Sequence, residues 1–257
     1  MERNRAEQAG IALACLDLTS LNDTDTEADI ATLCERAAGP HGPVAAVCVW
    51  PRLARFARDH AAATVAVAAV ANFPDGSTDI ERAVRDTGEV VQAGAQEVDV
   101  VLPYRALLAG DEKACTALLN AVRRASEGLL LKVILETGEL REPALMQHAA
   151  HLALDAGADF LKTSTGKTPV SATPQAAEIL LRAIRDEART GSLVGFKASG
   201  GVRTVAEAAV YIGLVESVLG AGALVPARFR IGASSLLTDI EAVLSGSAAT
   251  VNATTGY

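Results

Sequence analysis

The 257-residue sequence predicts an α/β fold with one domain, a closed (β/α)8 barrel of the TIM type. Short apolar runs alternate with longer segments of helical period along the whole chain, which indicates parallel strands buried on both faces. Eight such runs in about 250 residues fit this barrel. Polar residues end many of the runs, and a closed barrel collects such residues from all round its ring. An open doubly wound sheet is the alternative, but it gathers its ligands at one crevice, and no GxGxxG follows the first run.

The predicted strands are rich in Val, Ile, Leu and Ala, and polar turns separate them from the helical segments. In chain order the eight strands are expected at 11–19, 44–50, 64–70, 96–103, 129–136, 159–163, 193–197 and 228–232. Helices are expected between the strands and after the last, for example at 26–38, 77–94, 173–188 and 235–244. Residues 1–244 should form the barrel, and residues 245–257 a flexible tail ending in Tyr257.

The composition excludes several classes of function. A net charge of −8, a pI near 5.1 and 4% aromatic residues argue against a nucleic-acid partner. No apolar stretch is long enough to span a membrane, and no signal peptide is evident. The four cysteines are scattered without a CxxC pair, which is typical of reduced thiols. We expect a soluble cytoplasmic protein without a membrane partner.

Among the charged residues inside predicted strands, where burial is costly unless the charge is used, we single out Asp99, Lys162 and Lys197. Asp99 is in EVDVV, Lys162 in DFLKT and Lys197 in VGFK. If all three point into the barrel, two ammonium groups and one carboxylate meet. A second cation and partial desolvation lower the pKa of a lysine from ~10.4, so that its neutral amine can form a Schiff base. The alternative is a buried Lys–Asp ion pair with a second lysine that reaches solvent.

Small residues dominate the turns after the last three predicted strands. These turns are STGK at 164–167, ASGGVRT at 198–204 and IGASS at 231–235, and two of them carry a cation, Lys167 and Arg203. Glycine-rich turns expose backbone N–H groups to an anion, and the loops after the last strands of a barrel are its usual phosphate site. Ordinary turn chemistry would also favour Gly and Ser, but three such turns in succession favour a phosphate site.

Two other patterns carry no function. The GKT at 166–168 resembles the end of a Walker A loop, but Leu161 stands where that loop needs glycine. His148 and His151 are spaced i, i+3 on a helix without further ligands, which indicates a solvated surface. We find no metal signature in the sequence.

Long strings of the sequence resemble the deoxyribose-phosphate aldolase family. They run in order from about residue 13 to 238: LDLTSLNDTDT, NFPDG, EVDVVLPYRALLAG, LKVILETGEL, ADFLKTSTGK, GFKASGGVRT and IGASSLL. The resemblance implies a class I aldolase without metal or cofactor. Its reaction is the reversible cleavage of 2-deoxy-D-ribose 5-phosphate to D-glyceraldehyde 3-phosphate and acetaldehyde.

Roles for individual residues follow from the same resemblance. Lys162 corresponds to the Schiff-base nucleophile, Lys197 to the lysine that lowers its pKa and Asp99 to the acid of a proton relay. Cys48 matches a cysteine near the pocket, and Tyr257 could relay a proton if the tail closes. The resemblance also implies a homodimer. Residues that match substrate or phosphate contacts are Asp17, Thr19, Thr165, Gly166, Lys167, Gly200, Gly201, Val202, Arg203, Gly232, Ser234 and Ser235.

Two other functions stay open from the residues alone. One keeps the Schiff base but takes another phosphorylated aldol substrate, or carries out a transaldolase-like transfer. The other is a phosphosugar-binding barrel without catalysis. The second would require the loss of the lysine pair or of Asp99, and the chain retains all three.

Overall fold

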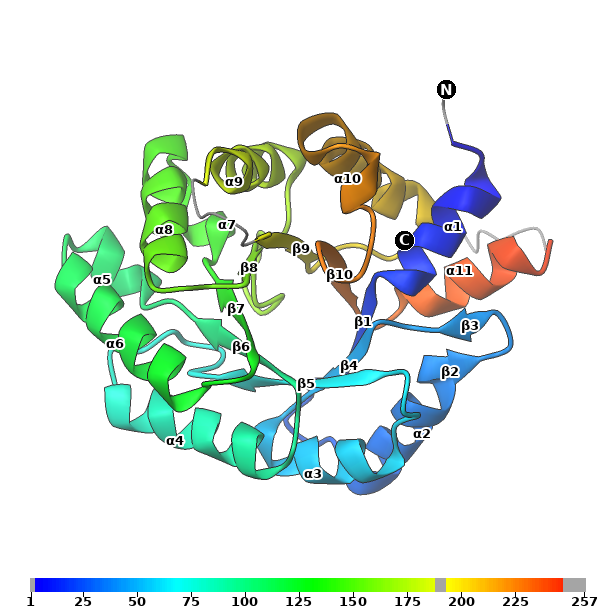
Figure 1. Ribbon diagram of the computed structural model, residues 1–257, viewed down its shortest axis with the longest axis horizontal. Coiled ribbons are helices and arrows are strands. Elements are labelled where there is room, and N and C mark those ends of the chain that lie inside the picture. The colour runs from blue at the N-terminus through cyan, green and yellow to red at the C-terminus, as the bar shows by residue number, and fades with distance from the viewer. Residues whose placement is uncertain (1–2, 188–192, 247–257) are drawn as a thin grey trace, which may run out of the picture.

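Eight parallel strands close into a barrel that helices surround in the computed structural model, which describes residues 3–187 and 193–246 (Figure 1). Around the ring the strands follow the order β1-β10-β9-β8-β7-β6-β5-β4. The predicted TIM barrel is therefore confirmed. The barrel strands are β1 (Leu16–Thr19), β4 (Ala46–Val49), β5 (Ala66–Ala71), β6 (Glu97–Val101), β7 (Leu130–Ile134), β8 (Phe160–Lys162), β9 (Gly195–Ser199) and β10 (Phe229–Ala233).

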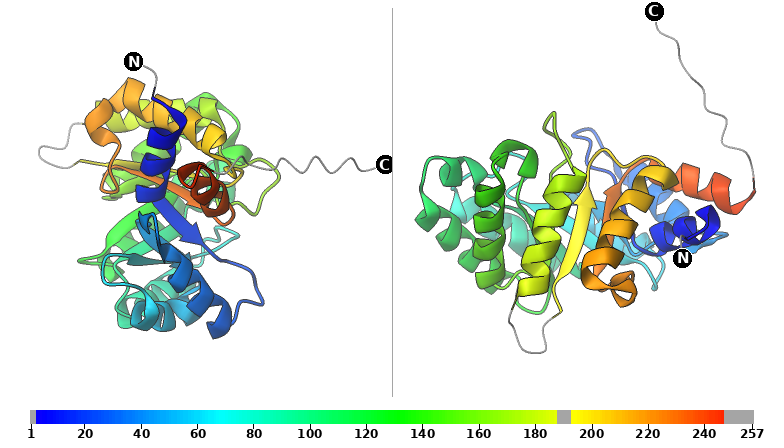
Figure 2. Two further views of the ribbon diagram at one scale, coloured as in Figure 1. Left: turned by 90° about the vertical axis from the view of Figure 1, so that its right-hand side faces the viewer. Right: turned by 90° about the horizontal axis from the view of Figure 1, so that it is seen from above.

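The helices lie outside the strands, as both views of Figure 2 show. Most begin at a polar side chain that accepts a backbone N–H, such as Thr204 before α10, which also forms a capping box with Glu207. The helices are α1 (Arg5–Ala14), α2 (Glu27–Ala37), α3 (Pro51–His60), α4 (Ile80–Gln92), α5 (Tyr104–Leu108), α6 (Glu112–Ala125), α7 (Thr137–Leu140), α8 (Pro143–Asp155), α9 (Pro174–Asp186), α10 (Val205–Leu219) and α11 (Leu236–Leu244).

The structure differs from the predicted elements at the start of the chain. Residues 11–19 are not one strand, because α1 continues to Ala14 and β1 begins only at Leu16. The buried side chains of Ala9, Ala12 and Leu13 have helical spacing, and a capping box at Asn4 fixes the start of the helix. A short antiparallel pair, β2 (Ala38–Gly39) with β3 (Gly42–Pro43), was also not predicted.

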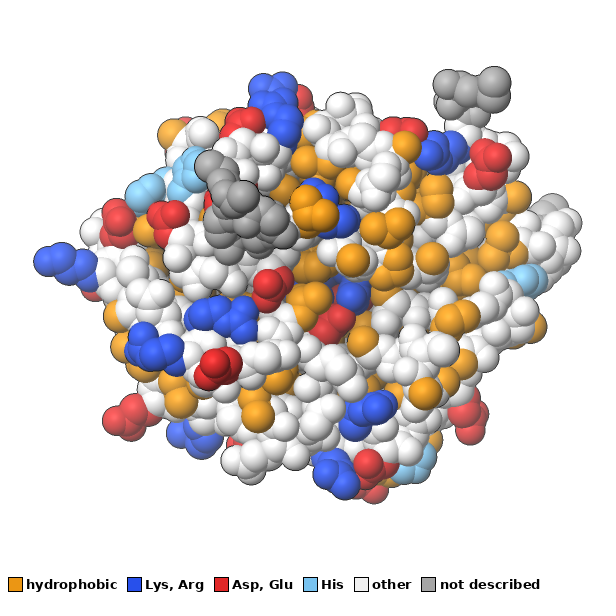
Figure 3. All heavy atoms as spheres, viewed as in Figure 1, with side chains coloured by type: hydrophobic (Ala, Val, Ile, Leu, Met, Phe, Trp, Pro, Cys, Tyr) orange, Lys and Arg blue, Asp and Glu red, His pale blue; other side chains and the backbone are white. Residues whose placement is uncertain are grey.

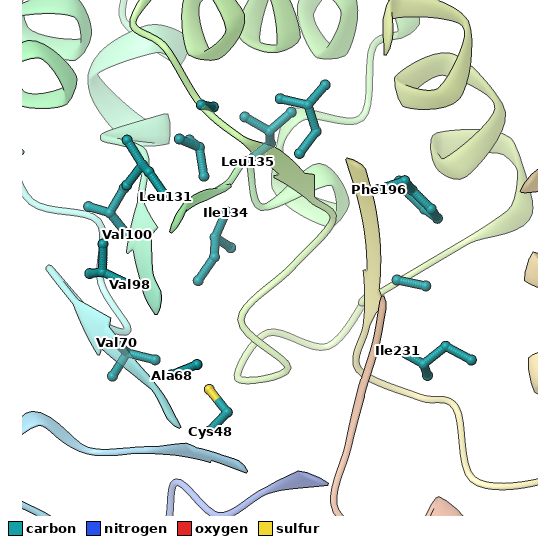
Figure 4. Close-up of a cluster of buried hydrophobic side chains, with 14 of the residues drawn as sticks. Cys48, Ala68, Val70, Val98, Val100, Leu131, Ile134, Leu135, Phe196 and Ile231 are labelled. Carbon is teal, nitrogen blue, oxygen red and sulfur yellow. The ribbon is translucent and has the colours of Figure 1, made fainter. Parts of the chain in front are cut away.

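The two faces of the strands have different chemistry. Val98, Val100 and Leu131 point outward and belong to the apolar core between barrel and helices (Figure 4). The alternate positions Asp99 and Lys132 point into the barrel, where their side chains bond each other. Parallel register places Asp99 opposite Lys132, Lys162 opposite Lys197, and Lys197 opposite Arg230. The interior of the barrel thus carries charged residues at two adjacent register positions, Asp99 with Lys132 and Lys162 with Lys197 and Arg230.

The outer surface carries acidic and basic side chains interspersed over the face that Figure 3 shows. Among the described residues, none of the helices is both long enough and apolar enough to cross a membrane.

Gly195 gives a test of the packing inside the barrel. A Cβ at this position would lie 2.3 Å from the ring of Phe160 on the neighbouring strand. Gly195→Ala should therefore lower the free energy of unfolding by ~1–3 kcal/mol, measured by urea denaturation. Gly213→Ala is the matched control, because Gly213 is exposed in helix α10 and a Cβ there would have no atom within 4 Å. The free energy of unfolding of the control should rise by ~0.5–1 kcal/mol. Equal stability of the two variants would contradict the packing argument.

Candidate active site

Asp99, Lys162 and Lys197 meet inside the barrel, from β6, β8 and β9. The Nζ atoms of Lys162 and Lys197 each lie 2.8 Å from the same oxygen of Asp99, Oδ2. Lys162 is 2% exposed, and the other two side chains are fully buried. One carboxylate oxygen therefore accepts from both lysines that the sequence singles out.

The surroundings shift the pKa values of Lys162 and Lys197 in opposite directions. Burial lowers the pKa of Lys162, and the positive charge of Lys197 lowers it further, while Asp99 opposes the shift only in part. Burial would also lower the pKa of Lys197, but Asp17 and Asp99 outweigh it and raise that pKa above its usual value. Lys162 is therefore the lysine that releases its proton more readily, and Lys197 stays charged.

Asp99 itself stays ionised. Burial would raise its pKa, but Lys132, Lys162 and Lys197 outweigh burial and hold the pKa well below the usual value for aspartate. A carboxylate with these partners can accept a proton through a water molecule or return one through the neighbouring ammonium groups.

Further ion pairs lie in the same interior. Lys132 Nζ lies 2.7 Å from Asp99 Oδ1 and also bonds Glu97. The guanidinium of Arg230 bonds Asp17 and Glu97, each at 2.6 Å. Asp17 also accepts from Lys197, is fully buried and has its pKa lowered by Lys197 and Arg230 against the effect of burial. The sequence predicted Asp17 as a substrate contact, and the structure places its carboxylate within these ion pairs.

A cavity of about 340 Å³ opens at the carboxyl ends of the strands. Eleven of the twelve residues that the sequence predicts as substrate or phosphate contacts line it, and Asp17 does not. Lys162 and Lys197 lie shortly before lining residues in sequence, Lys162 at the end of β8 and Lys197 in the middle of β9. The lining residues are Thr19, Ser20, Leu21, Asn22, Thr165, Gly166, Lys167, Ser199, Gly200, Gly201, Val202, Arg203, Gly232, Ala233, Ser234 and Ser235.

The turn after β9 requires glycine. Gly200 has φ +83°, and a Cβ there would lie 2.6 Å from Ser171 in the turn after β8. The two turns can therefore approach closely at the cavity. Helices α10 and α11 begin just after the last two turns, so the positive ends of their dipoles lie at this end of the barrel.

Two cations reach this cavity. Lys167 donates to the carbonyl oxygen of Leu21 at 2.8 Å, which leaves the charge of the ammonium group uncompensated. Within residues 3–187 and 193–246, no carboxylate pairs with the guanidinium of Arg203, whose backbone N–H bonds Glu207. Exposed N–H groups, two hydroxyl-bearing serines and two cations match the chemistry of a bound phosphate monoester.

Glu136 organises the turn that carries Lys167. It follows β7 in a left-handed conformation with φ 56°, and its side chain is buried. It accepts from the hydroxyl of Thr165 at 2.5 Å and from that of Thr168 at 3.2 Å. Because Thr165 gives its proton to Glu136, its oxygen is free to accept the N–H of Lys167, at 3.0 Å.

Four of these residues escaped the sequence analysis as site residues: Glu97, Lys132, Glu136 and Arg230. Lys132 and Arg230 carry the same signal as Lys162, a lone cation within an apolar run, in LLLKVILE and RFRIG. Glu97 shares the inward parity of Asp99. For Glu136 the only signal was a carboxylate directly after a strand.

Three other expectations concern Cys48, Tyr257 and possible metal ligands. Cys48 lies buried in β4, and burial raises its pKa although Lys197 and Lys162 act against the shift. Tyr257 lies outside the described residues. In the part of the chain that the structure describes, His, Cys, Asp and Glu form no group of three or more that could hold a metal ion.

Comparisons with known proteins agree with this geometry. A deoxyribose-phosphate aldolase of Agrobacterium fabrum is 46% identical over 246 residues, which are 93% of each chain. The crystal structure of a protein of Toxoplasma gondii ME49, assigned as a deoxyribose-phosphate aldolase, has a TM-score of 0.86 at 25% identity and covers 95% of this chain and 97% of its own. The tetrameric deoxyribose phosphate aldolase of Aeropyrum pernix has a TM-score of 0.73 at 25% identity, over 95% and 99% of the chains. Residues 11–241 match the aldolase family described as DeoC/LacD. The chain belongs to the DeoC/LacD family of aldolases.

Proposed function

We infer that this chain is a deoxyribose-phosphate aldolase, an aldehyde-lyase that cleaves 2-deoxy-D-ribose 5-phosphate to D-glyceraldehyde 3-phosphate and acetaldehyde. The observation that carries the assignment of roles is the shared oxygen of Asp99 between a lysine of lowered pKa and a lysine of raised pKa. This arrangement supports Lys162 as the nucleophile and Lys197 as the cation beside it.

The reaction begins with attack of the neutral Lys162 amine on the C1 aldehyde of the open-chain sugar. The carbinolamine loses water and becomes an iminium ion, which draws electrons from the C2–C3 bond. Asp99, which is ionised, receives the proton of the C3 hydroxyl through a water molecule. The C2–C3 bond then breaks, and glyceraldehyde 3-phosphate leaves.

The second half of the reaction releases acetaldehyde. Cleavage leaves an enamine on Lys162, which takes a proton at C2 and is then hydrolysed. We assign that proton to the Asp99 relay, with Tyr257 of the tail as a further donor. During the first half of the reaction, until glyceraldehyde 3-phosphate leaves, the phosphate is held in the cavity by the glycine turns, Ser234 and Ser235, and by Lys167 and Arg203.

The oligomer and the cellular compartment belong to the same proposal. We expect a homodimer in solution, although the Aeropyrum pernix relative is tetrameric, and light scattering would decide between the two. A cytoplasmic location is supported by four free, buried cysteines.

Acetaldehyde and sodium borohydride together should inactivate the enzyme and label Lys162. Reduction converts the imine to a stable secondary amine, which mass spectrometry of the digested protein locates. Lys162→Ala should abolish turnover and labelling, with the fold intact by circular dichroism. Activity should survive EDTA. Labelling of another lysine in the native enzyme would refute the assignment.

Lys197→Leu should shift the acid limb of the kcat/KM profile to higher pH. Loss of the neighbouring positive charge raises the pKa of Lys162, so a higher pH is needed to form its neutral amine. We expect a fall in rate of about 10²-fold or more at pH 7, whereas Lys197→Arg should keep the limb close to its native position. An unshifted limb in Lys197→Leu would rule out the electrostatic role.

Glu136→Gln should raise KM for deoxyribose 5-phosphate about 10-fold and leave kcat/KM for unphosphorylated deoxyribose nearly unchanged. The amide replaces one acceptor oxygen by a donor, so the turn that presents Lys167 loses its fixed geometry. Arg203→Ala serves as the reference for lost phosphate binding. Equal losses with both substrates would show that Glu136 acts on the reaction centre instead.

A further inference from the structure

The charged side chains inside the barrel are unequal in number. When all are ionised, there are four cations and three carboxylates, none more than 5% exposed. An uncompensated buried charge is costly, so the interior is best balanced when one cation is neutral. We call these residues the interior cluster: Asp17, Glu97, Asp99, Lys132, Lys162, Lys197 and Arg230.

The contacts within the interior cluster decide which cation is neutral. Lys197 and Arg230 each bond two carboxylates. Lys132 also bonds two, and a third carboxylate lies 3.7 Å away. Among the carboxylates of residues 3–187 and 193–246, Lys162 pairs only with Asp99, through an oxygen that Lys197 shares. Lys162 is therefore the cation with the least compensation.

We propose that Glu97 and Arg230 are positioning residues that set the charge balance of the interior cluster and so select Lys162 as the neutral amine. This inference rests on the proposed function, in which Lys162 is the nucleophile. Neither residue contacts Lys162, and both act through the lysines and carboxylates between.

The two residues act in opposite directions. Without Arg230, Asp17 and Glu97 lose a counter-ion and draw Lys197 and Lys132 toward themselves. Asp99 then depends more on Lys162, which keeps its proton to a higher pH. Without Glu97, Lys132 pairs more fully with Asp99, and Lys162 releases its proton at a lower pH.

Two further groups near Lys162 are Cys48 and Glu136, and neither contacts Glu97 or Arg230 in the described structure. Cys48 faces the lysines from β4 as a neutral thiol, because burial raises its pKa. Glu136, after β7, is occupied by Thr165 and Thr168. The guanidinium of Arg230 also lies 5.6 Å from the centre of the Phe160 ring, a cation–π contact of which methionine can keep only the packing.

The test is the pH dependence of acetaldehyde trapping on Lys162 in the full chain, measured relative to the native protein. The rate of trapping should rise with pH, as the neutral amine of Lys162 forms. Arg230→Met should move the midpoint of this rise to higher pH by about one unit, and Glu97→Gln should move it to lower pH by a similar amount. The double variant restores the balance, and its midpoint should return to within about 0.3 unit of the native value.

Two controls separate charge from structure. Arg230→Lys keeps the charge and should leave the midpoint in place. Arg228→Met removes a half-buried guanidinium that bonds Val194 outside the interior cluster. This variant should also leave the midpoint unchanged. If Arg230→Met does not fold, Glu97→Gln and the double variant still carry the test through their difference.

Shifts of the same sign in both single variants, or no shift, would overturn the proposal. Failure of the proposed function would look different, because the native protein would then show no trapping on Lys162 at any pH.

Discussion

The carboxylate of Asp99 is the group on which the rest of the site depends. Its two oxygens accept from three lysines, Lys132, Lys162 and Lys197. One negative charge cannot compensate three positive charges out of water, so further carboxylates must lie nearby or a proton must be lost. The structure uses both solutions. Asp17 and Glu97 hold two of the lysines in the charged form, and the third has a lowered pKa.

Closure of the barrel makes this arrangement possible. Asp17 and Lys197 are 180 residues apart in sequence and bond each other because β1 and β9 both adjoin β10 in the ring. Parallel register then places Asp99 beside Lys132 and Lys162 beside Lys197, at adjacent inward positions of the strands. The apolar surface that stabilises the fold is moved outward, to the layer between strands and helices, where Val98, Val100 and Leu131 lie (Figure 4).

Much of the barrel could be predicted because each strand is an apolar run of its own. The prediction was wrong at 11–19, where two adjacent elements share one apolar stretch and only the cap at Asn4 marks the helix. Asp99, Lys162 and Lys197 could be selected because they are costly to bury. Lys132 and Arg230 are equally costly to bury and could have been selected in the same way, whereas their ion pairs with Glu97 on another strand cannot be read from local sequence.

The segment DFLKTSTGK divides into two functions at the end of β8. Up to Lys162 the strand alternates, which directs that side chain into the dry, charged interior, where its pKa is lowered. Beyond it the chain turns at Gly166, with φ +78°, and Glu136 fixes the turn through Thr165. Lys167 is thereby kept at the wall of the open cavity. Lys167 lies at this wall, whereas Lys162 is only 2% exposed inside the barrel. The spacing of five residues from Lys162 to Lys167 thus separates the reacting end of a sugar phosphate from its anionic end.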